Sequence, residues 1–334
     1  MTQRILLGSE GHVPESLDGS YHRLGGVSVG WGWREVSAAD EDRWVEVFAH
    51  PIIADRAALQ LVAGQVGEQL GRQSPGPVSI SRLSPCQLAL RQRSAPFYQS
   101  EESRVRAYFE RVFMGVLRGP GAPVPKPTRG VAVAVESDEL LGQMRRISRT
   151  VGVSVASTFV ALASCLYQAK LGGSQRVDLI AANRLNRLLQ GYVGTVSQGV
   201  PMLAPSWQSR SNPGAFLTET WAASMVAYRH GIYDPAWLVR VEAETEPFGG
   251  VVVNVISDRD RPRRGNRVRD VASGSASSDA FRFTVTYGPL AESVRLVLWV
   301  SECLLRGGDI RELVRTMFLQ VDEWESWARE NRPS

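Results

Sequence analysis

Apolar and polar residues alternate, or recur at helical spacing, in a series of segments along the chain. Residues 44–50 alternate between the two kinds, and this period of two predicts a strand. Over residues 57–70 the apolar positions recur every three or four residues, which predicts a helix with one apolar face. Those positions are Leu59, Val62, Val66 and Leu70. A second helix is predicted to begin at Pro85 with Ser84 as its cap, because proline lacks the N–H group that a first turn leaves unpaired.

Strands and helices continue to interleave through the rest of the chain. The segments predicted to be helices are 102–117, 137–151, 154–171, 213–229 and 309–329. The segments predicted to be strands are 131–135, 176–181, 250–256, 282–287 and 294–300. Residues 1–30 show no clear period, so we expect an irregular arm there. Because the two kinds of element interleave throughout, the expected fold class is α/β, arranged as two lobes.

A proline-rich segment divides the chain. Residues 119–127 hold four prolines among small residues, a composition typical of an extended, semi-rigid linker. We therefore expect a first lobe over residues 1–118 and a second over residues 128–334. The chain has 334 residues, 43% of them apolar and 22% charged, which suits one large domain or two of medium size.

Charge is mixed along most of the chain. The net charge is +4 and the pI is about 9.1, but basic and acidic residues are interspersed except at residues 259–269. That cluster precedes a stretch of Gly, Ala and Ser, so we expect either a mobile surface loop or a docking patch for an acidic partner. No basic face interleaved with exposed aromatic residues is evident, which argues against nucleic-acid binding. The arginines of the cluster are Arg259, Arg261, Arg263, Arg264, Arg267 and Arg269.

Cysteine usage and the N-terminus indicate a reducing compartment. The three cysteines, Cys86, Cys165 and Cys303, are far apart and form no pair at metal-ligand spacing, so neither a disulfide framework nor a zinc site is expected. The first residues contain too short an apolar stretch for a signal peptide, and no apolar run is long enough to cross a bilayer. We therefore expect a cytoplasmic protein. No glycine-rich phosphate loop is present, so we expect no nucleotide cofactor.

A short motif lies between the strand predicted at 44–50 and the helix that follows. Its sequence is His50-Pro51-Ile52-Ile53-Ala54-Asp55-Arg56. It resembles the HHxxxDG motif of the condensation domains of non-ribosomal peptide synthetases and of their chloramphenicol-acetyltransferase-like relatives, of which the first histidine and the aspartate are kept. Later segments match the same family in the same order. These are residues 154–159, the strand ending in Asn183-Arg184, residues 189–201, Tyr228–His230 with Asp234-Pro235, strand 251–254, and residues 281–324.

The resemblance implies a fold, an activity and partners. The fold is the two-lobed chloramphenicol-acetyltransferase-like α/β sandwich, with a truncated N-terminal lobe. The activity is amide formation, less readily ester formation, between a small amine and an aminoacyl or acyl thioester in antibiotic or other natural-product biosynthesis. The thioester is presented on the phosphopantetheine of a carrier protein, and the enzyme itself binds no cofactor. A free-standing amide synthetase of the lincosamide type would suit such a chain.

Two departures from the family leave the function open. Pro51 replaces the second motif histidine, which in the resembled family usually has the positioning or basic role. Proline has no titratable side chain and cannot take over that role. Either another residue transfers the proton, or the chain is an inactive condensation-like module that recruits partner proteins to a synthetase. The first strand–helix–strand portion of the family's N-terminal lobe is also missing, and a homodimer would cover surface that this portion buries.

Five residues are the candidate site. His50 and His230 are candidates for proton transfer, and His50 is alternatively a structural hydrogen-bonding group. Asn254 is expected either to contact an oxyanion or substrate or to bond a buried neighbour. Asp55, just ahead of a helix, is expected to be a cap or loop anchor that the site needs. Cys86, in the first turn of a helix, is either a nucleophile favoured by the positive end of the helix dipole or a small apolar residue packed beneath the helix. A nucleophilic Cys86 would allow an acyl-enzyme route or, with water as acceptor, a thiol hydrolase. His12 and His22 are expected to face solvent, and Cys165 and Cys303 to pack in the core.

Overall fold

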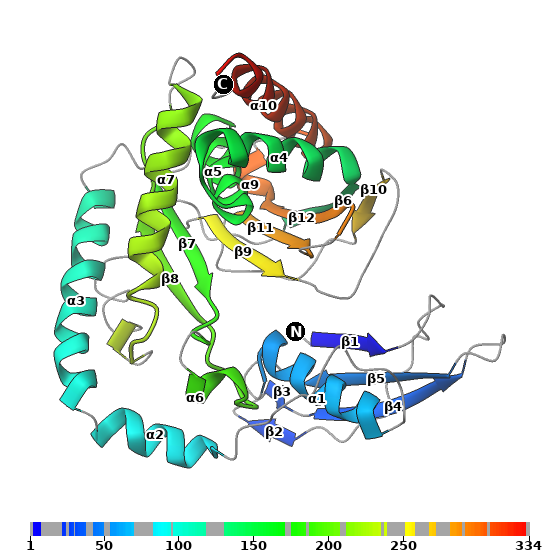
Figure 1. Cartoon of the computed structure of the whole chain (residues 1–334), viewed down its shortest axis with the longest axis vertical. Coiled ribbons are helices and arrows are strands. Elements are labelled where there is room, and N and C mark those ends of the chain that lie inside the picture. The colour runs from blue at the N-terminus through cyan, green and yellow to red at the C-terminus, as the bar shows by residue number, and fades with distance from the viewer. Residues whose placement is uncertain are drawn as a thin grey trace. The chain divides into compact units, whose positions relative to one another are not determined.

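The computed structural model describes most of the chain as two compact units (Figure 1). Unit 1 comprises Met1–Gln99 and Ala182–Gln198, and unit 2 comprises Ser100–Ala181 and Gly199–Ser334. The residues described are 3–7, 22–24, 27–29, 31–37, 43–49, 54–69, 83–94, 96–117, 130–170, 175–184, 187–207, 212–234, 237–238, 251–257, 267–271, 281–288, 291–305 and 308–331.

The two units divide the chain differently from the lobes expected from its prolines. Residues 100–117 belong to unit 2, and residues 182–198 return to unit 1. The proline-rich segment 119–127 lies outside the described residues, so the expected boundary stays a prediction.

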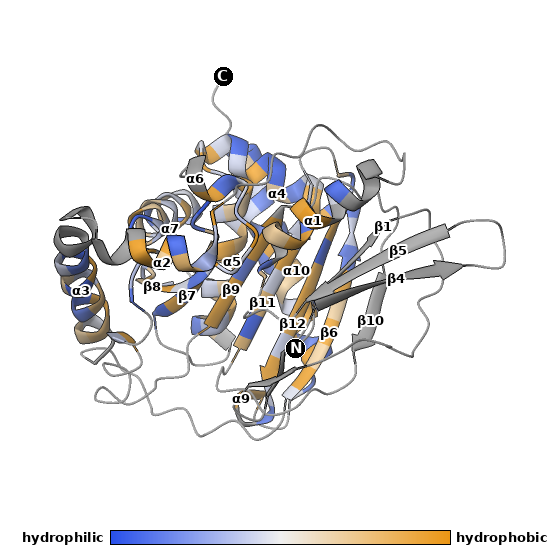
Figure 2. Cartoon of the chain, turned by 90° about the horizontal axis from the view of Figure 1, so that it is seen from below, coloured by the Kyte–Doolittle hydropathy of each residue, from blue (hydrophilic) through white to orange (hydrophobic). Residues whose placement is uncertain are grey.

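Unit 2 is built on a seven-stranded mixed sheet in the order β10-β6-β12-β11-β9-β7-β8. β9 runs parallel to β7 and β11, whereas β12 is antiparallel to both β11 and β6. Its strands are β6 (Gly130–Ser137), β7 (Arg176–Ala181), β8 (Gln198–Leu203), β9 (Val251–Ser257), β10 (Arg267–Val271), β11 (Phe281–Tyr287) and β12 (Val294–Ser301). Figure 2 shows the central strands largely in the orange of hydrophobic residues.

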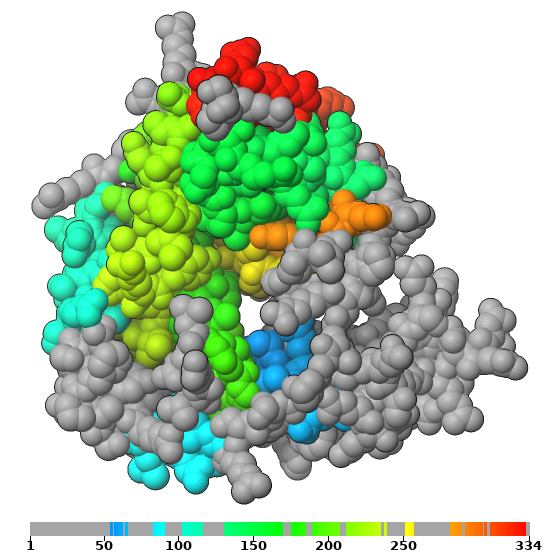
Figure 3. Space-filling model, in the orientation of Figure 1, coloured from blue at the N-terminus to red at the C-terminus, as the bar shows by residue number. Residues whose placement is uncertain are grey.

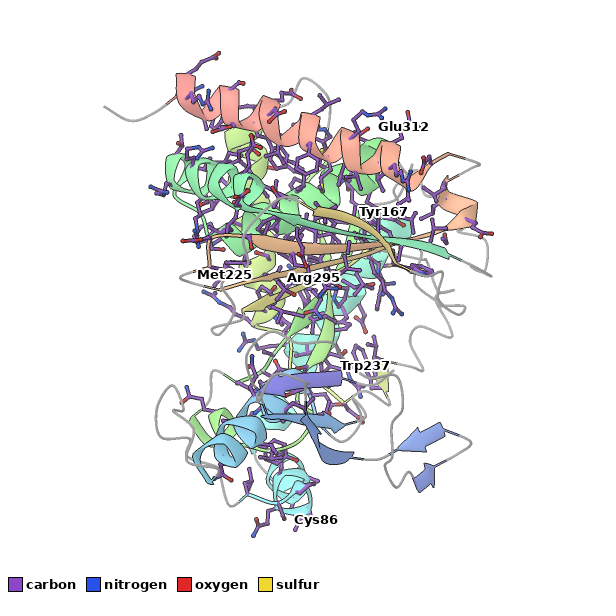
Figure 4. All side chains as sticks on the ribbon, turned by 90° about the vertical axis from the view of Figure 1, so that its right-hand side faces the viewer. Cys86, Tyr167, Met225, Trp237, Arg295 and Glu312 are labelled. Carbon is purple, nitrogen blue, oxygen red and sulfur yellow. The ribbon has the colours of Figure 1, made fainter. Side chains whose placement is uncertain are left out.

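Helices cover one face of this sheet and thereby form the core of unit 2. Alternate residues of β11 and β12, such as Phe283 and Leu298, are fully buried, while their neighbours are only partly so. Helices α4 and α5 pack on this face, with α7 and α10 beside them (Figure 1). Their bounds are α4 (Asp138–Val151), α5 (Val155–Lys170), α7 (Pro213–Tyr228) and α10 (Ile310–Glu330). Figure 4 labels Tyr167, which packs on Phe281 from the helical side, and Arg295 on the other side of the sheet.

Local chemistry explains where these helices begin and end. The Ser137 hydroxyl accepts a hydrogen bond from the Leu140 N–H at 3.0 Å and starts α4. That helix ends at Gly152, whose φ of 79° is a left-handed conformation in which glycine carries no steric penalty. Asn212 and Asp309 cap α7 and α10 in the same way as Ser137 caps α4.

A buried carboxylate joins α4 to α10. The Glu325 carboxylate, only 5% exposed, accepts hydrogen bonds from Arg146 at 2.5 Å, Arg329 at 3.1 Å and Gln143 at 3.2 Å. Burial acts to raise the pKa of Glu325, but the hydrogen bonds from Arg146, Arg329 and Gln143 outweigh it and hold the pKa below its ordinary value. The carboxylate therefore stabilises the fold in its ionised form.

We expect Glu325→Gln to lower the free energy of unfolding at pH 7 by about 1–3 kcal/mol, because three hydrogen bonds to an ion are weakened or lost. Since the folded-state pKa is depressed, this stabilisation is complete above the ordinary carboxyl pKa and is lost as the pH falls through the folded-state value. Urea unfolding of both proteins at pH 7 and pH 3 measures this. The difference in unfolding free energy between Glu325→Gln and the unsubstituted protein should be smaller at pH 3 than at pH 7. Glu330→Gln, on the exposed end of the same helix, is the control and should change little at either pH.

Unit 1 has a three-stranded antiparallel sheet in the order β1-β5-β4, a separate pair β2-β3 and three helices. Helix α1 lies in contact with β1 and β5. The bounds are β1 (Gln3–Leu7), β2 (His22–Leu24), β3 (Val27–Val29), β4 (Trp31–Ser37), β5 (Arg43–Ala49), α1 (Arg56–Gln69), α2 (Pro85–Ser94) and α6 (Arg187–Gln190). Helix α3 (Pro96–Leu117) leads into unit 2, to which α9 (Glu302–Leu305) also belongs.

Two expectations of irregular structure are wrong. β1, β2 and β3 lie within residues 1–30, where strands of three to five residues are too short to show a period. β10 places Arg267 and Arg269 on a strand rather than in a loop, because backbone pairing with β6 holds this segment in the sheet. The other arginines of the cluster lie outside the described residues.

Among the described residues, no single helix is long and apolar enough to cross a membrane. Only α4 and α5 taken together meet that test, and the chain bends by 104° between them. Both helices are packed in the core of unit 2.

Candidate functional site

The Asp55 carboxylate, in unit 1, is the centre of a saturated hydrogen-bond cluster. One oxygen accepts from the Ala58 N–H at 2.9 Å, which caps α1, and from the Arg184 guanidinium at 2.6 Å. The other accepts from the Val196 N–H and the Ser197 hydroxyl, each at 3.1 Å. Asp55 is 5% exposed, so four donors surround a buried carboxylate. This geometry is that of a helix cap and loop anchor.

The Arg184 guanidinium donates hydrogen bonds to backbone carbonyl groups in the loop of residues 189–197. One terminal nitrogen donates to the carbonyl oxygens of Leu189 and Tyr192, and the other donates to that of Gly194 as well as to Asp55. Its neighbour Asn183 adopts a φ of 55° and donates to the Val196 carbonyl at 2.8 Å. The Asn-Arg pair at the end of β7 thus holds the loop that closes on Asp55. The sequence placed Asp55 and Arg184 in two matched motifs but did not link them.

Cys86 lies at the beginning of α2 in unit 1 (Figure 4). Ser84 caps this helix as predicted, since its hydroxyl accepts from the Gln87 N–H at 3.2 Å while the Gln87 side chain accepts from the Ser84 N–H at 2.9 Å. Cys86 is exposed, so it is not packed beneath the helix. Burial, above all, raises the pKa of the nearby Tyr192; the charge of Arg184 opposes this, and those of Asp55 and Cys86 add to it.

His230, in unit 2, is held in one orientation by two elements. Its Nδ1 atom lies 2.8 Å from the Val226 carbonyl oxygen at the end of α7. Because a carbonyl oxygen only accepts, Nδ1 is the donor in this contact, and in the neutral ring Nε2 is the nitrogen with the free lone pair. The ring stacks on Tyr108 of α3, with centroids 4.2 Å apart and planes 6° from parallel. A neutral imidazole held in this contact can accept a proton at Nε2.

Two tyrosine hydroxyls bind the outer strand β8 close to His230. Tyr108 donates to the Pro201 carbonyl at 2.8 Å, and Tyr233 donates to the Gly199 carbonyl at 2.6 Å. Burial raises the pKa of Tyr108 well above its ordinary range, so its hydroxyl stays protonated and remains a donor. The Tyr108 side chain, on which the His230 ring stacks, is thereby held against β8.

Asn254 lies on the face of the sheet that α5 does not cover. It is half-buried on β9, and it lies opposite Thr284 of β11. Arg282, two positions before Thr284 on the same face, lies opposite Trp299 of β12. The Arg282 guanidinium lies over the Trp299 ring, 5.9 Å from its centroid. Asn254 is thus one of several polar side chains on this face, and its amide can donate to an oxygen atom of a ligand.

The remaining predicted site residues fall partly outside the described chain. His50, Pro51 and His12 are not described, and of His22 only the backbone, in β2, is described. Cys165 is buried in α5 as expected, and the side chain of Cys303 is not described. Asp55 and Cys86 belong to unit 1, and His230 and Asn254 to unit 2. In the part of the chain that is described, no three His, Cys, Asp or Glu side chains are grouped so as to hold a metal ion.

Sequence comparison places the chain in no family: no family model matches it, and no curated protein matches it. Solved structures do match. The condensation domain of the Monacolin K polyketide synthase MokA aligns over 90% of this chain and 73% of its own, with a TM-score of 0.70 and 13% identity. A structure of condensation domain-mediated chain release from the enacyloxin polyketide synthase aligns over 87% of this chain and 60% of its own, with a TM-score of 0.62 and 16% identity.

VibH, a condensation enzyme of non-ribosomal peptide synthesis, aligns over 84% of this chain and 70% of its own, with a TM-score of 0.54 and 16% identity. The chain thus spans 60 to 73% of the length of these three structures. Most of this chain aligns with each of them, although few of its residues are identical. The chain therefore has the chloramphenicol-acetyltransferase-like α/β fold of the condensation domains.

Proposed function

We propose that the protein is a condensation enzyme that forms an amide bond between a carrier-bound thioester and a small amine in natural-product biosynthesis. The observation that carries this proposal is the Asp55 cluster. On a condensation-domain fold, the aspartate of the degenerate motif still caps its helix and still holds the loop of residues 189–197 through Arg184. The retained cap and ion pair of Asp55 support an active protein over a decayed one.

The proposed reaction is direct aminolysis of the thioester. The amine nitrogen attacks the thioester carbonyl, the new C–N bond forms, and the C–S bond breaks to release the phosphopantetheine thiol. His230 accepts the proton from the amine at Nε2 and returns it to the departing thiolate. Asn254 donates a hydrogen bond to the developing oxyanion, and Asp55 caps α1 and holds residues 189–197 through Arg184. The protein supplies these side chains, and the carrier protein supplies the phosphopantetheine.

The direct test offers the protein an acyl-loaded carrier protein, or the acyl N-acetylcysteamine thioester, together with a panel of small amines. Mass spectrometry then follows the amide product. Formation of an amide above the enzyme-free rate supports the proposal. Absence of product with every amine, combined with measurable binding of the carrier protein, supports the recruiting module that the replacement of histidine by Pro51 favours.

Cys86→Ala separates direct aminolysis from an acyl-enzyme route. We expect turnover within about twofold of the unsubstituted protein, because aminolysis needs no protein nucleophile. Intact-mass measurement during turnover should show no acyl adduct on the protein. Loss of turnover in Cys86→Ala, together with an adduct that this variant lacks, would establish the acyl-enzyme route instead. Release of free acid in place of amide would indicate the hydrolase.

A further inference from the structure

Helix α7 has apolar residues on its outer face as well as on its inner one. Phe216 and Leu217 point into the core of unit 2. On the opposite side Trp221, Met225 and Val226 are 38%, 43% and 43% exposed. Figure 3 shows the yellow-green atoms of this helix forming part of the molecular surface. Three exposed apolar side chains on one helix face are a candidate interaction surface.

The exposed face of α7 carries one charge of each sign. Glu219 lies on its N-terminal half and Arg229 just past its C-terminal end, ten positions later, which is about 15 Å along a helix. Neither side chain forms an ion pair within the part of the chain that is described. Between them lie the apolar residues and the small Ala222, which allows another helix to approach closely.

We propose that this face binds a second copy of the chain, with the two α7 helices antiparallel about a twofold axis. An antiparallel pair brings Glu219 of each copy to the level of Arg229 of the other, whereas a parallel pair would bring like charges together. The balanced charge also suits a copy of the same surface better than an acidic partner, which would favour a face with an excess of cations. The proposal assigns a surface to the homodimer considered from the sequence, and it does not depend on the proposed activity.

The association is expected to be weak. A standard interface buries about 800 Å² on each partner, and one helical face supplies only the centre of that area. Exposed ion pairs contribute little to affinity, so the apolar residues between them must provide most of it. We therefore expect a dimer in the micromolar concentration range.

Sedimentation velocity of the whole chain, from about 1 to about 200 μM, tests the proposal. The unsubstituted protein should shift from monomer to dimer over this range. Glu219→Arg and Arg229→Glu should each weaken the dimer about tenfold, because each places like charges opposite one another twice. The double variant should return to within about twofold of the original affinity. That rescue is expected only if the two residues face each other across the dimer.

Met225→Arg should leave the protein monomeric throughout, whereas Leu319→Arg should not affect association. Leu319 is a matched control, because it is an exposed leucine, 62% accessible, on α10 rather than α7. Circular dichroism and thermal unfolding of each variant show that it is folded. A protein that stays monomeric up to about 200 μM, single charge variants that dimerise normally, or a double variant no tighter than the single ones would each overturn the proposal.

Discussion

Asp55→Ala is expected to lower the free energy of unfolding of unit 1 by about 3–5 kcal/mol, because it leaves a buried guanidinium without its carboxylate. Arg184 is as enclosed as Asp55, with about 9% of its side chain exposed. The substitution also removes the cap of α1 and frees the N–H of Val196 and the hydroxyl of Ser197. Urea unfolding monitored by circular dichroism measures the change.

Asp309→Ala is the control that distinguishes the loss of the buried ion pair from the loss of a helix cap. Asp309 caps α10 through the Arg311 N–H at 2.9 Å, as Asp55 caps α1, but it is exposed and forms no buried ion pair. Its replacement should cost about 0.5–2 kcal/mol, the usual contribution of a cap. If Asp55→Ala costs no more than Asp309→Ala, the buried pair with Arg184 does not hold the loop of residues 189–197 in place. The observation that carries the proposed function would then be lost.

His230→Ala is expected to lower the rate of amide formation by about 10²–10⁴-fold, the usual contribution of a positioned general base. The reason is the contact of Nδ1 with the Val226 carbonyl, which makes Nε2 the proton acceptor of the neutral ring. The rate is measured with the thioester and the amine that give product with the unsubstituted protein. Single-turnover measurements show whether the chemical step, rather than product release, has slowed.

Tyr108→Phe is the matched variant for this test. It keeps the aromatic ring stacked on His230 and removes only the hydrogen bond to the Pro201 carbonyl. We expect its turnover to stay within a few-fold of the original. Unchanged amide formation in His230→Ala would show that another group accepts the proton. An equal loss in Tyr108→Phe would assign the effect to the packing of α3 on β8 rather than to the imidazole.

The longer elements of the fold were predictable from the sequence. The period over residues 57–70 predicts α1 within one residue of its observed start, and the Ser84-Pro85 signal locates the beginning of α2. Burial on one face imposes such periods, so they survive in the sequence. β1 and β10 lack this signal because each is only five residues long and is defined by its pairing with β5 or β6. Pairing between distant segments leaves no local pattern.

The same reason explains which parts of the candidate site were missed. The sequence identified Asp55 as a cap, but its pairing with Arg184 joins residues 129 positions apart. Tyr108 was expected only as part of a helix, and nothing in its neighbourhood indicates that its ring stacks on His230, which lies on a different element. Side chains brought together by tertiary folding become visible only in the structure. Residue types and spacing predicted the candidates, and the fold supplies their partners.

The two tyrosines that donate hydrogen bonds to β8, the outermost strand at one edge of the described sheet, also affect what this edge can bind. An outermost strand normally offers unpaired carbonyl groups to any extended peptide that meets it, and this is a route to fibre growth and to unwanted complexes. Here Pro201 has no N–H to offer, and its carbonyl and that of Gly199 are already engaged by Tyr108 and Tyr233. The carbonyl groups of Gly199 and Pro201 are therefore already occupied, so this part of β8 is a poor template for the addition of a foreign strand.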